Sequence, residues 1–431
     1  MTAKTALVAG LLAALTAGCG EKDVILPGER FDIRATEPFV NQSGPVNFAA
    51  ARVNADWSHR NGGPDHLISN PALGANLSLV FATDIGAGDS RRARITAEPV
   101  VAGNVIYTLD AAANVVATST SGAVLWTKTL APHRANRTAA SGGGVSVSGG
   151  KVFATSGFGE LTALDAASGA TLWTQDLDAP GTSSPTVKGD LVYVVARNSA
   201  AWALDVNNGR IQWQLAASPT VANFGGGAGV AATDDIAVFP FPSGEVIATF
   251  PQGGLQRWSA MISGDRPGKA SAAINDISGD PVIIGDRVYV GNFGGQVAAL
   301  NLFDGERIWT SPNGALGPVW PAGNAVFLVS DLNQLVRLDA ATGDTIWKVQ
   351  LPIGDISTKR QQTAIPAHYG PILAGGRLIV TSSDGNMRSF DPASGALIGA
   401  VPIPSGAASS PVVAGGTLYV ISKEGQLLAF R

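Results

Sequence analysis

Residues 184–215 read SPTVKGDLVYVVARNSAAWALDVNNGRIQWQL. Four short runs rich in Val, Leu, Ile and Trp stand out at residues 184–187, 191–196, 201–205 and 210–215. The runs do not repeat an apolar residue every three or four positions, as an amphipathic helix would. Runs of this length and composition between turn residues predict β-strands. We therefore expect one four-stranded antiparallel sheet from this stretch.

The same pattern recurs along the chain. A glycine stands four residues before a tryptophan at Gly122/Trp126, Gly169/Trp173, Gly209/Trp213, Gly254/Trp258, Gly305/Trp309 and Gly343/Trp347, and a seventh copy, Gly395/Gly399, lacks the tryptophan. A second signal, a turn followed by a β-rich run, aligns at Tyr107, Phe153, Tyr193, Val238, Tyr289, Phe327, Ile379 and Tyr419. These eight positions lie 38 to 52 residues apart. Four strands in units of about 45 residues are typical of propeller blades rather than of helical repeats.

The two ends of the chain complete the eighth unit. That unit stops at Arg431, before its fourth strand. Leu79–Ile85 matches Leu172–Leu177, with Phe81 in the tryptophan position. An N-terminal strand that joins the three C-terminal strands closes the ring and removes open sheet edges. The predicted fold is all-β, an eight-bladed β-propeller of four-stranded antiparallel blades over residues 77–431.

A turn of the form Asp-x-x-(Ser/Thr/Asn/Asp)-Gly precedes the fourth strand in several units, at Asp165–Gly169, Asp205–Gly209, Asp339–Gly343 and Asp391–Gly395. The aspartate can accept hydrogen bonds from backbone N–H groups, and the glycine supplies a positive φ. The alternative interpretation is that these aspartates are catalytic carboxylates. Recurrence on equivalent turns favours the structural role.

The six tryptophans are also expected to have a structural role. Neighbouring blades diverge with radius, and an indole is large enough to fill the wedge while its N–H reaches a carbonyl. A stacking platform for a cofactor is the alternative. We expect Trp126, Trp173, Trp213, Trp258, Trp309 and Trp347 to dock one blade against the next.

Composition narrows the functional classes. The 431 residues are 45% hydrophobic and 14% charged, which argues against a disordered chain. The net charge of -4 argues against nucleic-acid binding. A single cysteine, Cys19, excludes an internal disulfide and a multi-cysteine metal site.

Residues 1–19 read MTAKTALVAGLLAALTAGC and predict a signal peptide, because Lys4 precedes an apolar run too short to span a bilayer. Small residues before Cys19 resemble a lipobox, although Thr16 stands where leucine is usual. We expect Cys19 to be acylated, as with palmitate, and to anchor the chain to a membrane surface. An ordinary secretory signal is the alternative. Residues 20–76 are expected to form a tether and a cap on the propeller.

The repeat, a turn followed by Gly-x-Leu-x-Ala-Leu-Asp-x-x-(Ser/Thr)-Gly-x-x-x-Trp, resembles the PQQ-type propeller repeat over most of the chain. Two families carry this repeat: quinoprotein dehydrogenases and the outer-membrane assembly factors called BamB. The lipobox-like start, the length and the lack of an appended domain make the sequence similar to the BamB family. That resemblance implies a non-enzymatic lipoprotein on the periplasmic face of the outer membrane. It also implies membership of the β-barrel assembly (BAM) complex, binding to BamA, and help in inserting outer-membrane proteins.

The alternative is a periplasmic PQQ-dependent dehydrogenase or ligand binder. The resemblance to that family implies two adjacent cysteines and a calcium ion, and this sequence has no cysteine pair. Common catalytic and phosphate-binding motifs are missing as well. We therefore expect no catalytic, cofactor or metal site. The histidines His59 and His66 are expected to be polar loop residues rather than metal ligands.

Partner contacts are expected on loops. The longest insertions cover Met261–Asp280 and Pro352–Tyr369. The BamB resemblance implies contacts from two loops, which match Leu215–Phe224 and Ile274–Asp280 here. The candidate partner-binding residues are Leu215, Phe224, Asp276 and Ser278, where Asp276 matches an acidic position and Ser278 replaces a second acid.

Overall fold

The structure is a computed structural model that describes residues 39–133, 141–181, 183–220, 226–264, 274–354 and 365–431. The predicted signal peptide and Cys19 lie outside these residues. The chain divides into two units, Met1–Val40 and Asn41–Arg431, and every described strand belongs to the second. Within the described ranges, no helix has the length and apolarity needed to cross a membrane.

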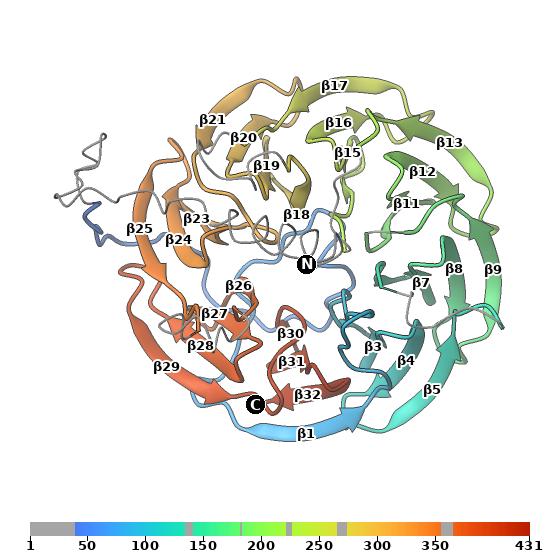
Figure 1. Ribbon diagram of the computed structural model, residues 1–431, viewed down its shortest axis with the longest axis horizontal. Helices are drawn as coiled ribbons and strands as arrows, with labels where there is room; N and C mark the ends of the chain where they lie inside the picture. Colours follow the sequence, from blue (N-terminus) through green and yellow to red (C-terminus); the bar gives the residue numbers. More distant parts are fainter. Residues whose placement is uncertain (1–38, 134–140, 182, 221–225, 265–273, 355–364) are drawn as a thin grey trace, which may run out of the picture. The chain divides into compact units, whose positions relative to one another are not determined.

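The second unit is a ring of eight blades, each a four-stranded antiparallel sheet (Figure 1). This confirms the predicted eight-bladed β-propeller. Successive strands of a blade lie progressively farther from the ring axis, so the first strand lines the central channel and the fourth forms the rim.

The first four blades follow each other in chain order. Blade 1 contains β2 (Val100–Ala102), β3 (Val105–Leu109), β4 (Asn114–Ser119) and β5 (Val124–Thr129). Blade 2 contains β6 (Val145–Ser148), β7 (Lys151–Thr155), β8 (Glu160–Asp165) and β9 (Thr171–Asp176). Blade 3 contains β10 (Thr186–Lys188), β11 (Leu191–Val195), β12 (Ala200–Asp205) and β13 (Ile211–Ala216). Blade 4 contains β14 (Ala231–Ala232), β15 (Ala237–Pro240), β16 (Glu245–Thr249) and β17 (Gln256–Met261).

The other four blades include the one that joins the chain ends. Blade 5 contains β18 (Ile277–Ile284), β19 (Arg287–Asn292), β20 (Val297–Asn301) and β21 (Arg307–Ser311). Blade 6 contains β22 (Trp320–Ala322), β23 (Ala325–Val329), β24 (Gln334–Asp339) and β25 (Thr345–Gln350). Blade 7 contains β26 (His368–Ala374), β27 (Arg377–Ser382), β28 (Asn386–Phe390) and β29 (Leu397–Pro402). Blade 8 contains β30 (Val412–Ala414), β31 (Thr417–Ile421), β32 (Gln426–Phe430) and β1 (Leu79–Asp84).

The predicted closure of the ring is confirmed. Strand β1 pairs with β32, with Phe81 opposite Ala429. Ser78 and Arg431 exchange backbone hydrogen bonds of 2.9 and 3.0 Å beside this pairing. The ring is therefore closed by backbone hydrogen bonds between residues at the two ends of the propeller sequence.

The aspartates of the recurring turns bond to their own turns. Asp165 Oδ1 accepts hydrogen bonds from the backbone N–H and the hydroxyl of Ser168, at 2.8 and 2.7 Å. These bonds hold the pKa of Asp165 below its usual value. Asp391 and Ser394 repeat the arrangement. The carboxylates cap turns and are not available as a catalytic set.

The six indoles bridge neighbouring blades. Each Nε1–H donates to a backbone carbonyl of the next blade: Trp126 to Ala166, Trp173 to Val206, Trp213 to Pro251, Trp258 to Leu302, Trp309 to Ala340 and Trp347 to Pro392, at 2.8 to 3.2 Å. The turn glycine of the next blade lies flat against the indole, as Gly343 does against Trp309. The hydrophobic core is accordingly divided among the seams between blades.

Residues 41–76, which we call the cap, begin beside the outer strand β25 and then cross the inside of the ring (Figure 1). The cap forms a hydrogen bond with each of the eight blades. In the order of blades 1 to 8, the pairs are Trp57 with Val101, Ser58 with Val147, His59 with Val187, Pro64 with Ala232, Asp65 with Ile283, Asn47 with Asn324, Pro71 with Gly375 and Asn54 with Gly415. Trp57 also stacks on Trp320 with ring centroids 6.2 Å apart. The cap is thus part of the propeller and closes one mouth of its channel.

Candidate functional site

The hydrogen bonds of the cap show which mouth of the channel it covers and which mouth stays open. The carbonyls of Asn54 and Pro71 accept hydrogen bonds from Gly415 and Gly375, which lie between the first and second strands of their blades. In an antiparallel blade, this turn lies at the end opposite to the loops that lead to the next blade. Those loops therefore surround the other mouth, which we call the open face.

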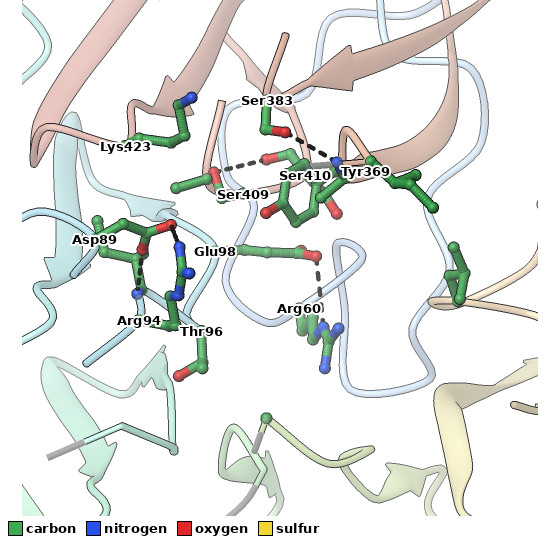
Figure 2. Close-up of a pocket in the computed structure, with 16 residues that line it drawn as sticks. Arg60, Asp89, Arg94, Thr96, Glu98, Tyr369, Ser383, Ser409, Ser410 and Lys423 are labelled. Atoms are coloured by element: carbon green, nitrogen blue, oxygen red, sulfur yellow. Dashed lines mark hydrogen bonds and ion pairs between the residues drawn. The ribbon is translucent and has the colours of Figure 1, made fainter. Parts of the chain in front are cut away.

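The open face leads into a pocket of about 540 Å³, which we call the axial pocket (Figure 2). Loops that connect blades supply most of its wall, and Arg60 reaches it from the cap. Its polar lining consists of Arg60, Asp89, Arg94, Thr96, Glu98, Tyr369, Ser383, Ser409, Ser410 and Lys423. Three of these side chains are cations and two are carboxylates.

Arg60 ties the cap to two blades by ion pairs. Its Nε lies 3.4 Å from Glu98 Oε1, and its Nη1 lies 3.1 Å from Asp280 Oδ1. Burial alone would lower the pKa of Arg60, but Asp280 and Glu98 outweigh it and raise the pKa. Both carboxylates are buried, where an unpaired charge is costly, and the guanidinium lies beside both of them. Asp280 Oδ2 also lies 3.9 Å from His66 Nε2.

The two cap histidines lie in the loop segment before β1, and both side chains are buried. His59 Nε2 accepts a hydrogen bond of 3.0 Å from the backbone N–H of Val187. Burial, helped by nearby His66, lowers the pKa of His59 to about 3. His66 Nδ1 donates to the carbonyl of Pro281 at 2.8 Å. Both imidazoles hold the cap in the channel, and no third ligand joins them within the described residues.

Ion pairing and backbone contacts engage most of the pocket rim. Arg94 Nη1 lies 3.2 Å from Asp89 Oδ2, while Asp89 Oδ1 accepts from the backbone N–H of Ile95. Ser383 Oγ accepts from the N–H of Ala367 at 2.9 Å. Burial, with a smaller contribution from Asp89, raises the pKa of Tyr369 to about 12, so the phenol stays neutral at neutral pH. These groups can hydrogen-bond a solute, and none is poised as a base.

A buried serine–histidine pair lies near the pocket at the start of β26. His368 Nδ1 lies 2.7 Å from Ser382 Oγ, and its Nε2–H donates to the carbonyl of Pro352 at 2.9 Å. Neither side chain is exposed enough to meet a substrate. Burial lowers the pKa of His368, which keeps the imidazole neutral. The pair braces the start of β26 and does not form a nucleophile.

The axial pocket does not fit a quinone held with calcium. Calcium needs several oxygen ligands that converge on one point. The pocket carboxylates, Asp89 and Glu98, are each paired with an arginine, and no cluster of three His, Cys, Asp or Glu side chains forms in the described ranges. Cys19 is the single cysteine, so the adjacent pair of the dehydrogenases has no counterpart.

The structure does not bring the predicted partner-binding residues onto one surface. Leu215 lies in β13, half-buried against the core of its seam. Asp276 is only 2% exposed, so its expected exposure in an acidic loop is wrong. The Ser278 hydroxyl donates to the carbonyl of Ala315. Phe224 lies outside the described residues.

Known proteins resemble the chain in both sequence and structure. A family profile described as outer membrane protein assembly factor BamB matches residues 111–349 and 353–431. The protein of that name from Escherichia coli is 25% identical over 325 residues, which are 74% of this chain and 80% of the relative. The Moranella endobia protein is 26% identical over 231 residues, and the match spans only 60% of its length.

Solved structures share the fold. BamB from Moraxella catarrhalis superimposes with a TM-score of 0.69 at 18% identity, covering 83% of this chain and all of that one. A quinohemoprotein alcohol dehydrogenase from Comamonas testosteroni gives 0.65 at 15% identity, covering 88% of this chain and 81% of the other. The structural likeness therefore includes both families that carry the repeat. The sequence profile covers most of the blades, and by that match the chain belongs to the family of outer membrane protein assembly factor BamB.

Proposed function

We propose that the chain is a non-enzymatic scaffold subunit of the BAM complex at the outer membrane. In this proposal Cys19 carries the lipid that holds the chain on the periplasmic face. The propeller binds a BamA-like barrel subunit and helps outer-membrane proteins to insert. The profile match across residues 111–349 and 353–431 is the observation that carries the proposal. The paired carboxylates of the axial pocket agree with a binding role rather than catalysis.

The open face is the proposed partner surface. The cap occupies the opposite mouth, whereas the blade-connecting loops surround the open face and line the axial pocket. The loop that begins beyond Leu215 belongs to this face, and Gly226 at its far end lines the axial pocket. Loops on a rigid scaffold are common binding elements. Asp276 is not part of the proposed surface, because its side chain is buried.

Affinity purification from membranes tests the proposal. The full chain with a C-terminal tag should retain a BamA-like barrel subunit after mild detergent extraction. The Cys19→Ser variant should lose its membrane association, because no acyl chain can be attached. Recovery of the wild-type chain without any barrel-assembly subunit would overturn the scaffold role. Unchanged membrane association of Cys19→Ser would overturn the anchor.

A further inference from the structure

A second pocket lies at the seam between blades 1 and 2, and we call it the seam pocket. Its volume is about 710 Å³, which is within the usual range of small-molecule sites. The cap contributes Asp56, blade 1 contributes Val105 and Tyr107, and blade 2 contributes Asp165. Gly103, in the turn between β2 and β3, also lines the pocket, so the pocket lies on the face that carries the cap. Three parts of the chain thus converge on one cavity.

The two charged side chains of the seam pocket are both acidic. Asp56 Oδ1 accepts a hydrogen bond of 3.0 Å from the N–H of Gly103, and Asp165 Oδ1 is bound by Ser168. The second oxygen of each carboxylate has no hydrogen-bond partner among the described residues, and neither carboxylate forms an ion pair with them. The hydrogen bonds from Ser168 lower the pKa of Asp165, so this carboxylate is ionised at neutral pH. The pocket therefore presents negative charge without a cation of its own.

The same place at two other seams is crossed by a basic side chain. Arg287, the first residue of β19, reaches from blade 5 to blade 6, where its Nη1 donates to the carbonyl of Ala340 at 2.7 Å. Lys151, the first residue of β7, reaches from blade 2 to Asn207 of blade 3 at 3.0 Å. At the seam pocket, Val105 has this place in β3 and is too short to cross. The seam that Arg287 crosses keeps a recess of only about 380 Å³.

The walls of the seam pocket suit an organic cation. The side chains of Val105, Tyr107 and Leu125 give it an apolar wall. The carbonyl of Ala166 already accepts from the Tyr107 hydroxyl at 3.2 Å and from Trp126 Nε1 at 3.0 Å. This carbonyl corresponds to that of Ala340 at the other seam, so an incoming cation has the carboxylates as its free acceptors. Basic groups on long stems lie against apolar surface in this way.

A metal ion fits the seam pocket less well. Calcium takes about six to eight oxygen ligands that converge on one point. The pocket has two carboxylates, and no cluster of three His, Cys, Asp or Glu side chains forms in the parts of the chain that the structure describes. The apolar wall would face a metal ion without binding it.

From these observations we propose that the seam pocket binds a guanidinium or ammonium group carried on an apolar stem. The cation takes the place that Arg287 has at its own seam and faces Asp56 and Asp165. Its stem lies against Val105 and Tyr107. A guanidinium is favoured over an ammonium, because its planar fork matches carboxylates. The group reaches the pocket either on a free small molecule or as the side chain of a peptide. The inference goes beyond the proposed function, because the pocket lies on the face opposite to the proposed partner surface.

Two probes on the full chain test the inference. A labelled five-residue peptide with a central arginine is followed by fluorescence anisotropy, and agmatine, a guanidinium on a short carbon stem, is followed by calorimetry. We expect saturable binding that weakens at least tenfold when citrulline replaces the arginine, because citrulline keeps the shape and lacks the charge. Added salt should weaken the binding as well. Tighter binding of the peptide would assign the site to polypeptides, and tighter binding of agmatine to free small molecules.

Two variants locate the binding in the seam pocket. Val105→Arg supplies the crossing cation from the chain itself and should weaken binding of both probes at least tenfold. Leu191→Arg is its matched control, because Leu191 has the same place in β11. Asp56→Asn should also weaken binding at least tenfold, while its Oδ1 can still accept from the turn. Asp190→Asn is the matched control, because Asp190 is an exposed aspartate in the turn between β10 and β11.

The outcomes are decisive for the pocket and separate from the proposed function. Equal binding by Val105→Arg and Leu191→Arg, with melting temperatures unchanged, would overturn the inference. If Val105→Arg melts early, equal binding by Asp56→Asn and Asp190→Asn would overturn it instead. Equal affinity for the arginine and citrulline peptides, or no saturable binding of either probe, would also overturn it. Retention of a BamA-like subunit is measured independently, so the scaffold role stands or fails without regard to these results.

Discussion

The docking of turn glycines on indoles can be tested by a matched pair of substitutions. At Gly343, an added Cβ would lie 2.4 Å from Trp309 Cε3, and φ is +76°. At Gly399, the same methyl would meet no atom within 4 Å. A left-handed conformation costs a residue with a Cβ roughly 1–2 kcal/mol, and overpacking adds about 1–3 kcal/mol. Gly343→Ala should therefore lower the free energy of unfolding by about 2–5 kcal/mol.

Urea denaturation measures this difference. With a slope of about 3 kcal/mol per molar urea, the midpoint of Gly343→Ala should fall by about 1 M. Gly399→Ala should leave the midpoint unchanged or raise it slightly, since alanine is easier to order than glycine in a strand. Truncating the indole in Trp309→Ala removes the clash, so the double variant should be more stable than the sum of the single effects predicts. Equal midpoints for the two alanine variants would refute docking as the reason for the glycine.

Three further outcomes follow from the seams and the cap. Trp173→Ala should lower the stability by about 3–5 kcal/mol, measured by urea denaturation, because it empties an aromatic site between blades. Arg60→Met should lower it by about 3–5 kcal/mol at pH 7, because Glu98 and Asp280 stay buried without their partner. The stability should fall as the pH drops from about 6.5 toward 3, because the pKa of His59 is about 3 in the folded chain and the unfolded chain binds the proton first. His59→Gln should reduce that pH dependence in the same denaturation assay.

The ring could be predicted from sequence because its determinants are local and repeated. The Asp-x-x-x-Gly turn fixes its geometry within five residues, as Asp165 and Ser168 show. Each of the six tryptophans follows a turn glycine at the same spacing of four residues. The match of Leu79–Ile85 to a fourth strand indicated closure for the same reason. Because each local signal is weak but recurs along the chain, the number of blades could be predicted.

The cap and the axial pocket could not be predicted in the same way. The cap meets the blades mainly through single backbone hydrogen bonds, such as those of Ser58 and Pro64, which impose no side-chain pattern. His59, His66 and Arg60 lie in a glycine- and proline-rich segment that looks like a polar loop, and only their partners on blades 1, 3 and 5 show that they are buried. The burial of Asp276 was missed because a loop insertion was equated with exposure. A Trp and two His within ten residues was the available signal for a buried segment.

The missing tryptophan of blade 7 is explained by the way the ring closes. In blade 2, the N–H of Asp165, at the end of the third strand, donates to the carbonyl of Ala170. In blade 8, the N–H of Arg431, just after the third strand, donates to the carbonyl of Ser78 in the equivalent bond. Ser78 therefore corresponds to Ala170, and Leu77 to the docking glycine, Gly169. Because the incoming chain puts a leucine where the other seams have glycine, an indole at position 399 would have no flat turn to lie against. At the other seams the large partner is the indole and the small partner is the glycine. At this seam Leu77 is the large partner and Gly399 the small one. The exchange leaves a recess of about 430 Å³ beside β29, which Leu77 and Gly399 line.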